Sequence, residues 1–125
     1  MKVEISNGEL VDKLTILEIK LSKADPTTEA GKRYHIEKEH DILKPLVSEL
    51  SIDPKIIESL RLVNSTLWET EDEIRQKEKK QEFDDEFTNL ARKVYINNDE
   101  RYRIKKEINS LTSSDIQEQK LYNNM

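Results

Sequence analysis

The sequence predicts an all-α protein, an antiparallel bundle of about four long helices that follow a short extended N-terminal arm. Two glycines and three prolines in 125 residues leave few places for turns. Apolar residues make up 34% of the chain and charged residues 38%, whereas average globular domains have about 45–50% and about 25%. So few apolar residues suit the narrow stripes of long helices, and the length suits a single domain over residues 1–125.

The arm and the first helix come from the first 23 residues. Met1–Ile5 alternates apolar and polar residues, so it is a short strand or an extended arm that lies against helices or against another chain. Ser6 and Glu9 form a capping box at which the first helix begins, and the helix runs to about Lys23. We expect this helix to lie deepest in the bundle, because it carries a coiled-coil-like seam of Leu10, Leu14, Leu17 and Leu21.

The second helix is predicted from about Thr27 to Leu50. The pair Asp25-Pro26 marks its start, because Asp caps helices well and Pro is tolerated at the first helical position. Pro45 lies inside the helix and removes one backbone hydrogen bond. We therefore expect a kink or a break near Asp41.

The third and fourth helices are predicted by similar local signals. Asp53-Pro54 repeats the start signal, and the third helix runs from Pro54 to about Lys80. Acidic residues favour the start of the fourth helix, which runs from about Asp85 to Leu111. Ser114 and Gln117 are the start signal of one last short helix.

The fourth helix has an irregularity, because Asn97 and Arg101 fall where its apolar stripe requires apolar residues. A hairpin that turns near residue 82 places Arg101 between the helices, where an arginine is costly unless a carboxylate pairs with it. Glu71 and Glu18 are the candidate partners. Three interpretations stay open: a polar layer that fixes the helix register, a ligand pocket in which Arg101 holds an anion while Trp68 stacks on a ring, or an arginine that points to water.

The third helix carries an acidic run, Glu69–Glu73, and carboxylates of this kind hold Mg²⁺ for phosphate chemistry when they face inward. All-helical enzymes of that kind need a second acidic pair on another helix, and here the corresponding pair is Asn98-Asp99. Pairing of the acids with Arg75 and Lys77 at i,i+4 spacing is favoured instead. We therefore predict no cofactor, with Mg²⁺ as the alternative.

Glu37 and His40 have the Glu-x-x-His spacing of di-metal carboxylate bundles. Such centres need two of these motifs, and the other histidine, His35, has no acid three positions before it. We therefore predict no metal centre, and Glu37 and His40 are the nearest candidates for one.

Composition narrows the function classes further. A net charge of −5 argues against a nucleic-acid-binding face, and the absence of Cys excludes disulfides and thiolate chemistry. No run approaches the ~18 apolar residues of a membrane span, and the first residues lack the apolar core of a signal peptide. We expect a cytoplasmic protein, in the host cytoplasm if the chain is phage-encoded.

Three segments of the chain, GELVDKLTILEIK from Gly8, LWETEDEIR from Leu67, and NDER followed by KKEIN from Asn98, resemble a family of short bacterial and phage proteins catalogued only as a domain of unknown function. The resemblance spans nearly the whole chain and implies no known activity. It implies that polar helix residues in these segments matter, several of them at the level of Arg101.

Two functions follow as hypotheses. The first is a non-enzymatic interaction or assembly module, a homodimer or the partner of another protein, because narrow apolar stripes leave apolar surface uncovered. The second is a binder of a small anion, nucleotide or nucleotide sugar, or a Mg²⁺-dependent enzyme, so an enzymatic role stays open although the sequence favours a non-enzymatic one. The candidate ligand-binding residues are Lys13, Glu18, Trp68, Glu71, Asp72, Asn97, Asn98, Asp99, Arg101 and Lys105.

Overall fold

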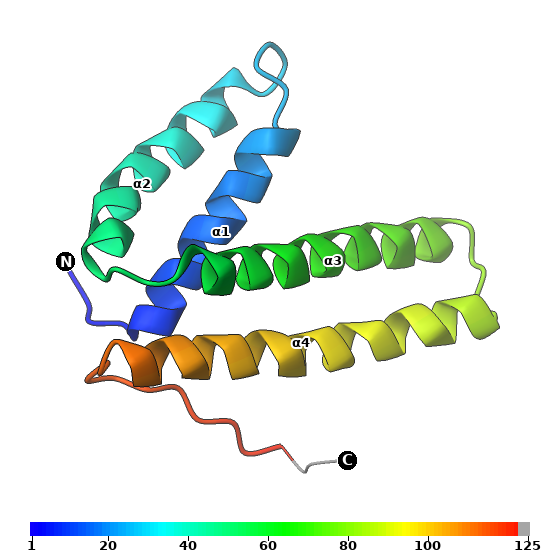
Figure 1. Ribbon diagram of the computed structural model, residues 1–125. Coiled ribbons are helices and arrows are strands. Elements are labelled where there is room, and N and C mark those ends of the chain that lie inside the picture. Colours follow the sequence, from blue (N-terminus) through cyan, green and yellow to red (C-terminus); the bar gives the residue numbers. More distant parts are fainter. Residues whose placement is uncertain (123–125) are drawn as a thin grey trace.

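The computed structural model describes residues 1–122 and contains four helices there, with no strand (Figure 1). The helices are α1 (Asn7–Lys23), α2 (Ala30–Glu49), α3 (Pro54–Lys79) and α4 (Asp85–Leu111). They form two hairpins, α1–α2 and α3–α4, and the first hairpin crosses the second near one of its ends (Figure 1). The all-α class predicted from composition is confirmed. No helix in this part of the chain is long and apolar enough to cross a lipid bilayer.

Side-chain caps fix where three of the helices begin. The Ser6 hydroxyl accepts the Glu9 N–H at 3.1 Å, and the Asp84 carboxylate accepts the Phe87 N–H at 2.9 Å. Asp53 caps α3 in the same way through the N–H of Lys55. These local signals explain why the starts of α1, α3 and α4 agree with the sequence analysis.

Helix α2 differs from its prediction at two points. It begins at Ala30 because the Asp25 carboxylate accepts the N–H groups of Thr27 and Thr28, at 2.7 and 3.0 Å, and holds that segment in a turn. The second difference is that the helix does not break at Pro45, which lies inside the continuous α2. Apolar side chains of α2 on both sides of the proline pack on the core and keep the helix together.

The two ends of the described chain also differ from expectation. Residues 1–5 form no strand, and Val3 is 75% exposed, so the arm does not lie against the helices. No helix follows α4 up to residue 122, because Ser113 takes a left-handed conformation (φ 52°) and the Ser114 N–H donates to the Asn109 carbonyl oxygen at 2.8 Å. Residues 114–122 therefore leave α4 and run back along it (Figure 1).

Helix α1 lies at the centre of the fold, where it packs against all three other helices. The shared core combines side chains from every helix, and its buried members are Val11, Leu14, Val47, Leu60, Ile104 and Ile108. The leucine seam of α1 thus lies in the interior, as its spacing predicts, although Leu10 and Leu21 are only partly buried. A second face of α1 is left to meet α3 and α4.

Gly8 sets the distance between α1 and α4. A Cβ at this position would lie 2.5 Å from the Lys105 carbonyl oxygen, and the Gly8 N–H donates to the Asn109 side chain at 2.6 Å. Only a residue without a side chain allows two helices to approach so closely. This contact brings the polar residues of α1 within reach of those of α4.

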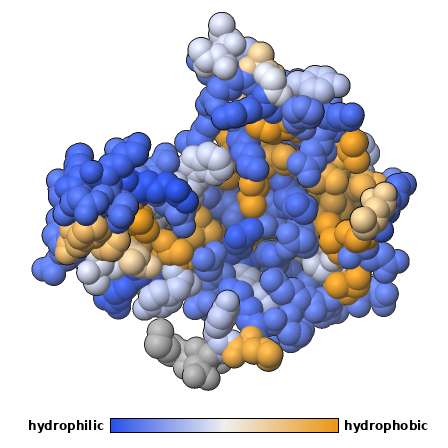
Figure 2. Space-filling view, turned by 180° about the vertical axis from the view of Figure 1, so that it is seen from behind, coloured by the Kyte–Doolittle hydropathy of each residue, from blue (hydrophilic) through white to orange (hydrophobic). Residues whose placement is uncertain are grey.

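The far end of the α3–α4 hairpin, residues 70–96, stands as a two-helix arm beyond α1 (Figure 1). Figure 2 shows hydrophobic side chains on the surface of this arm. Phe83, Tyr95 and Ile96 are 55%, 42% and 50% exposed. The arm therefore presents apolar surface that the four helices of one chain do not cover.

Candidate functional site

A buried polar network joins α1, α3 and α4. The Asp12 carboxylate is 1% exposed and accepts two hydrogen bonds from Arg101, at 2.9 Å from Nε and 2.5 Å from Nη2. The Asn64 amide donates to the same carboxylate and to the Thr15 hydroxyl, both at 2.9 Å. Arg101 thus lies between the helices, as predicted, and its bidentate pair fixes the guanidinium plane.

Asp12 takes the role that the sequence analysis assigned to Glu71 or Glu18, and that assignment is wrong. Glu18 pairs with Arg61 at 3.1 Å, and Glu71 lies near Arg75 at 3.8 Å. Gly8 explains the difference, because the close approach of α1 to α4 brings the short Asp12 side chain within reach of Arg101. The hydrogen bonds that Arg101 donates to Asp12 raise the pKa of the guanidinium above its ordinary value.

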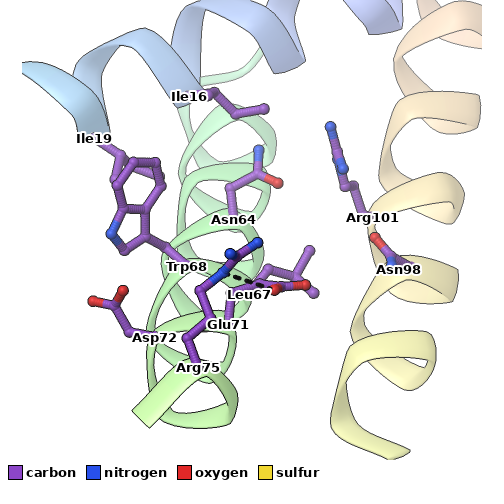
Figure 3. Close-up of a pocket in the computed structure, with 10 residues that line it drawn as sticks. All are labelled: Ile16, Ile19, Asn64, Leu67, Trp68, Glu71, Asp72, Arg75, Asn98 and Arg101. Atoms are coloured by element: carbon purple, nitrogen blue, oxygen red, sulfur yellow. Dashed lines mark ion pairs between the residues drawn. The ribbon is translucent and has the colours of Figure 1, made fainter. Parts of the chain in front are cut away.

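A cleft of about 510 Å³ opens beside this network, between α1, α3 and α4 (Figure 3). Its volume falls within the range of small-molecule sites, about 300–1,000 Å³. The walls combine apolar side chains with polar side chains of both charge signs: Ile16, Ile19, Asn64, Leu67, Trp68, Glu71, Asp72, Arg75, Asn98 and Arg101. Five of the predicted ligand-binding residues therefore line one space, namely Trp68, Glu71, Asp72, Asn98 and Arg101.

The cleft has a fixed floor and a looser rim. Asn64 and Arg101 are held by the buried network, whereas the Arg75 side chain is 76% exposed and lies 3.8 Å from Glu71. Trp68 forms one wall, and the Lys23 ammonium group lies 6.0 Å from its ring centre. Figure 3 shows Arg101 extending from α4 toward α1, at the edge of the open space between α3 and α4.

A smaller polar pocket of about 270 Å³ lies on the other side of Arg101 and shares Asn98 with the cleft. Its most buried charge is Lys105, whose ammonium group pairs with Glu9 at 2.7 Å and with Glu118 at 3.2 Å. Burial lowers the pKa of Lys105, but the hydrogen bond to Glu9 and the surrounding carboxylates outweigh it, so the net shift is upward. The ammonium group of Lys105, a predicted ligand-binding residue, is thus already held by two ion pairs within the protein.

Three other predicted site residues lie outside the cleft. Asn97 turns back to its own helix and donates to the Lys93 carbonyl oxygen at 2.9 Å, so it does not share a polar layer with Arg101. Asp99 lies 3.9 Å from Lys120, on the surface of α4. Lys13 is exposed on α1.

The candidate metal ligands do not meet. Glu37 pairs with Arg33 at 3.0 Å, and His40 lies beside Asp41. Within residues 1–122, no group of three or more histidine or acidic side chains is arranged to hold a metal ion.

Sequence reasoning missed Asp12, Thr15 and Asn64, which are all buried. A signal for each was present. Asp12 and Thr15 continue a row from Gly8 at helical spacing, on the face of α1 next to the leucine seam, and Asn64 lies between Leu60 and Leu67 on one face of α3. On α1 and α3, as on α4, a polar residue inside an apolar row indicates that this residue is buried and pairs with another polar group.

Comparison with known proteins adds the family. Residues 1–125 match the model of a family of unknown function (DUF6165). The chain belongs to this family. No curated protein and no solved structure matches it. Membership in DUF6165 thus confirms the resemblance noted in the sequence, while the bacterial or phage origin stays a prediction.

The three segments that carry the DUF6165 resemblance meet at the cleft. The first contributes Ile16 and Ile19, the second supplies the α3 wall from Leu67 to Arg75, and the third contributes Asn98 and Arg101. Segments that are far apart in the sequence therefore build one concave surface in the fold.

Proposed function

We propose that this DUF6165 protein binds a small molecule in the cleft, and that the molecule combines a ring with an anionic group, as nucleotides and nucleotide sugars do. The observation that carries this proposal is the meeting of a tryptophan wall and a held arginine in one space of about 510 Å³. Structural polar layers are packed shut, whereas this network has one side open to a cleft.

The ring is assigned to Trp68. Its indole lies with Ile16, Ile19 and Leu67 on the cleft wall, so a flat ligand ring that stacks there loses water from the face that meets the indole. Trp68 is also the one tryptophan of the chain. It gives binding a fluorescence signal of its own.

The anionic group is assigned to the two arginines. Asp12 occupies Nε and Nη2 of Arg101, which leaves Nη1 as a donor held in a fixed direction. Asp12 also neutralises most of the Arg101 charge, so the exposed and loosely paired Arg75 supplies the mobile positive charge. This division of roles favours a ligand with one or two negative charges over a polyanion.

A thermal-shift screen with nucleotides, nucleotide sugars and Mg²⁺ tests the proposal. A ligand at about 100 times its Kd stabilises the native state by about 2.7 kcal/mol and must raise Tm. The hit is then titrated by tryptophan fluorescence against Arg75→Ala and against Arg103→Ala, a matched change of an arginine on the far surface of α4. Binding should weaken only with the first variant. If no compound raises Tm, or if both variants bind equally, the cleft is not the site.

A second function is favoured by a different observation, the apolar surface of the two-helix arm. Phe83, Tyr95 and Ile96 are exposed there, and long helices normally bury such residues against a neighbour. On this basis the protein is an assembly module that self-associates. Light scattering tests it, and a particle of 14.8 kDa at every concentration would speak against it.

A further inference from the structure

One face of α3 is covered by α1 at its start and is bare afterwards. Arg61, Asn64 and Trp68 meet α1, through Glu18, the buried network and the cleft wall beside Ile19. The same helical face continues with Asp72, Arg75 and Lys79 at spacings of four, three and four residues from Trp68. These three side chains belong to exposed residues, so the face is available beyond α1.

The exposed face of α3 beyond Trp68 is complementary in charge to a second copy of itself. If a second copy of α3 lies antiparallel on it with Asp72 opposite Arg75 of that copy, two-fold symmetry repeats the same ion pair on the other side. The same register sets Trp68 opposite the ammonium group of Lys79, again twice, in the arrangement of a cation–π contact. Charge pairs of this kind determine partner and direction where helices associate side by side.

Next to Trp68 lies a second cavity, of about 660 Å³, which we call the lysine notch. Its cations are Lys20, Lys23 and Lys32, and its acids are Glu29, which lies 3.8 Å from Lys32, and Asp72. Its apolar walls include Ile36 and Trp68, and Lys20 and Lys23 have no ion-pair partner among the described residues. The register described above brings the loop that follows Lys79 of the second copy to this notch. The notch must therefore suit what that loop carries.

The tip of the α3–α4 hairpin carries the opposite charge. Four of the five residues from Glu82 to Glu86 are acidic, and the fifth is Phe83, which is 55% exposed and packs edge-on against Phe87 at 5.2 Å. Lys77 pairs with three of these acids, and Asp85 has no ion-pair partner among the described residues. An acidic tip with one apolar side chain matches a basic notch with apolar walls.

We propose that the protein forms an isologous dimer in which the hairpin tip of each copy lies in the lysine notch of the other, with the two α3 helices antiparallel across Asp72 and Arg75. This specifies the surface for the self-association proposed above and rests on it. The second copy covers the rim of the cleft, because Asp72 and Arg75 belong to both surfaces. The cleft is then enclosed by two chains.

Charge reversal at the two sides of the contact tests the dimer. One variant carries Lys20→Glu and Lys23→Glu in the notch, and the other carries Glu82→Lys and Asp85→Lys at the tip. Each variant alone sets like charges against each other twice, so sedimentation should show the dimer Kd rising about tenfold or more. Mixed one to one, the variants regain opposite charges at both contacts, and a heterodimer of wild-type affinity should form.

Reversal of two lysines on α2, Lys38→Glu and Lys44→Glu, is the matched control and should leave the dimer intact. Circular dichroism confirms that each variant is folded before it is mixed. A wild-type protein that stays at 14.8 kDa up to high concentration overturns self-association itself. A wild-type dimer that resists both reversals, or variants that fail to recover on mixing, overturn only this surface.

Discussion

Removal of the Asp12 carboxylate should destabilise the protein more than any change at its surface. Asp12→Ala deletes a side chain that is 1% exposed and that holds both the Arg101 guanidinium and the Asn64 amide. Arg101 would keep its charge, since its pKa lies above the physiological range with or without a partner. A positive charge would then remain between three helices with no carboxylate hydrogen-bonded to it, because Glu9 and Glu118 act on it only from a longer range.

The size of the loss follows from the burial of the two partners. Removal of one member of a buried ion pair costs about 3–5 kcal/mol, because the other charge stays in a place where water solvates it poorly. The Arg101 side chain is 28% exposed through the cleft, so water can reach part of it, and the lower end of that range applies. We expect a loss of about 3 kcal/mol in the free energy of unfolding, or roughly 10 °C in Tm.

Urea denaturation followed by circular dichroism measures the loss, and a double-mutant cycle identifies its cause. Arg101→Met alone should also destabilise, because it leaves the Asp12 carboxylate buried. The double variant Asp12→Ala with Arg101→Met should lose less than the two single losses together. The exposed pair Arg103 and Glu100 is the control, where removal of one partner should change the free energy by about 0.5 kcal/mol or less. A loss below about 1 kcal/mol for Asp12→Ala, or strict additivity in the cycle, would refute the reasoning.

Three further predictions concern stability. Gly8→Ala should destabilise the protein by about 2 kcal/mol, because its Cβ would lie 2.5 Å from a carbonyl oxygen of α4. Gly31→Ala is the control, because its Cβ meets nothing within 4 Å, and it should stabilise the protein by about 0.5–1 kcal/mol. Urea midpoints compare the two variants, and equal effects would contradict the contact of Gly8 with α4. The hydrogen bond from the Lys77 ammonium and the N–H of Phe87 at the start of α4 hold the pKa of Asp84 below its ordinary 3.8. The charged Asp84 therefore stabilises the folded protein above pH 3.8, and this stabilisation is lost as the pH falls below that value. The Tm of Asp84→Asn should lie below that of wild type at neutral pH and approach it only in acid. Ser6→Ala should cost about 1 kcal/mol by thermal denaturation, and no change would mean that the cap on α1 is dispensable.

Helix positions could be predicted where the signal was local. The bounds of α4 agree with the sequence analysis at both ends, because Asp84 caps one end and the chain turns left-handed at the other. The start of α2 was wrong because Asp25 can cap a helix or close a turn, and the two uses look alike in sequence. Pro45 shows the same limit, since packing on both sides of a proline decides whether a helix breaks.

The candidate site could be predicted only in part. Arg101 was found because it interrupts the apolar stripe of its own helix. Trp68 was found because the register of the α3–α4 hairpin, which depends only on two neighbouring helices, places it near the level of Arg101. Asp12 was missed because its contact with Arg101 spans 89 residues and depends on how closely α1 approaches α4. That distance is set by Gly8, whose effect appears only when the two helices are placed together.

The contact of α1 with α4 has a consequence for synthesis on the ribosome. The N–H of Gly8 is bonded to a side chain 101 residues later, and that of Asn7 to one 107 residues later. When α1 leaves the exit tunnel, α2 is the only neighbour soon to follow, and Asp12 has no cation to meet until most of the chain exists. Contacts between distant parts of a chain slow folding, and unfinished cores expose apolar surface. At the stage of the nascent α1–α2 hairpin, the face of α1 that α3 and α4 cover in the finished fold is still exposed.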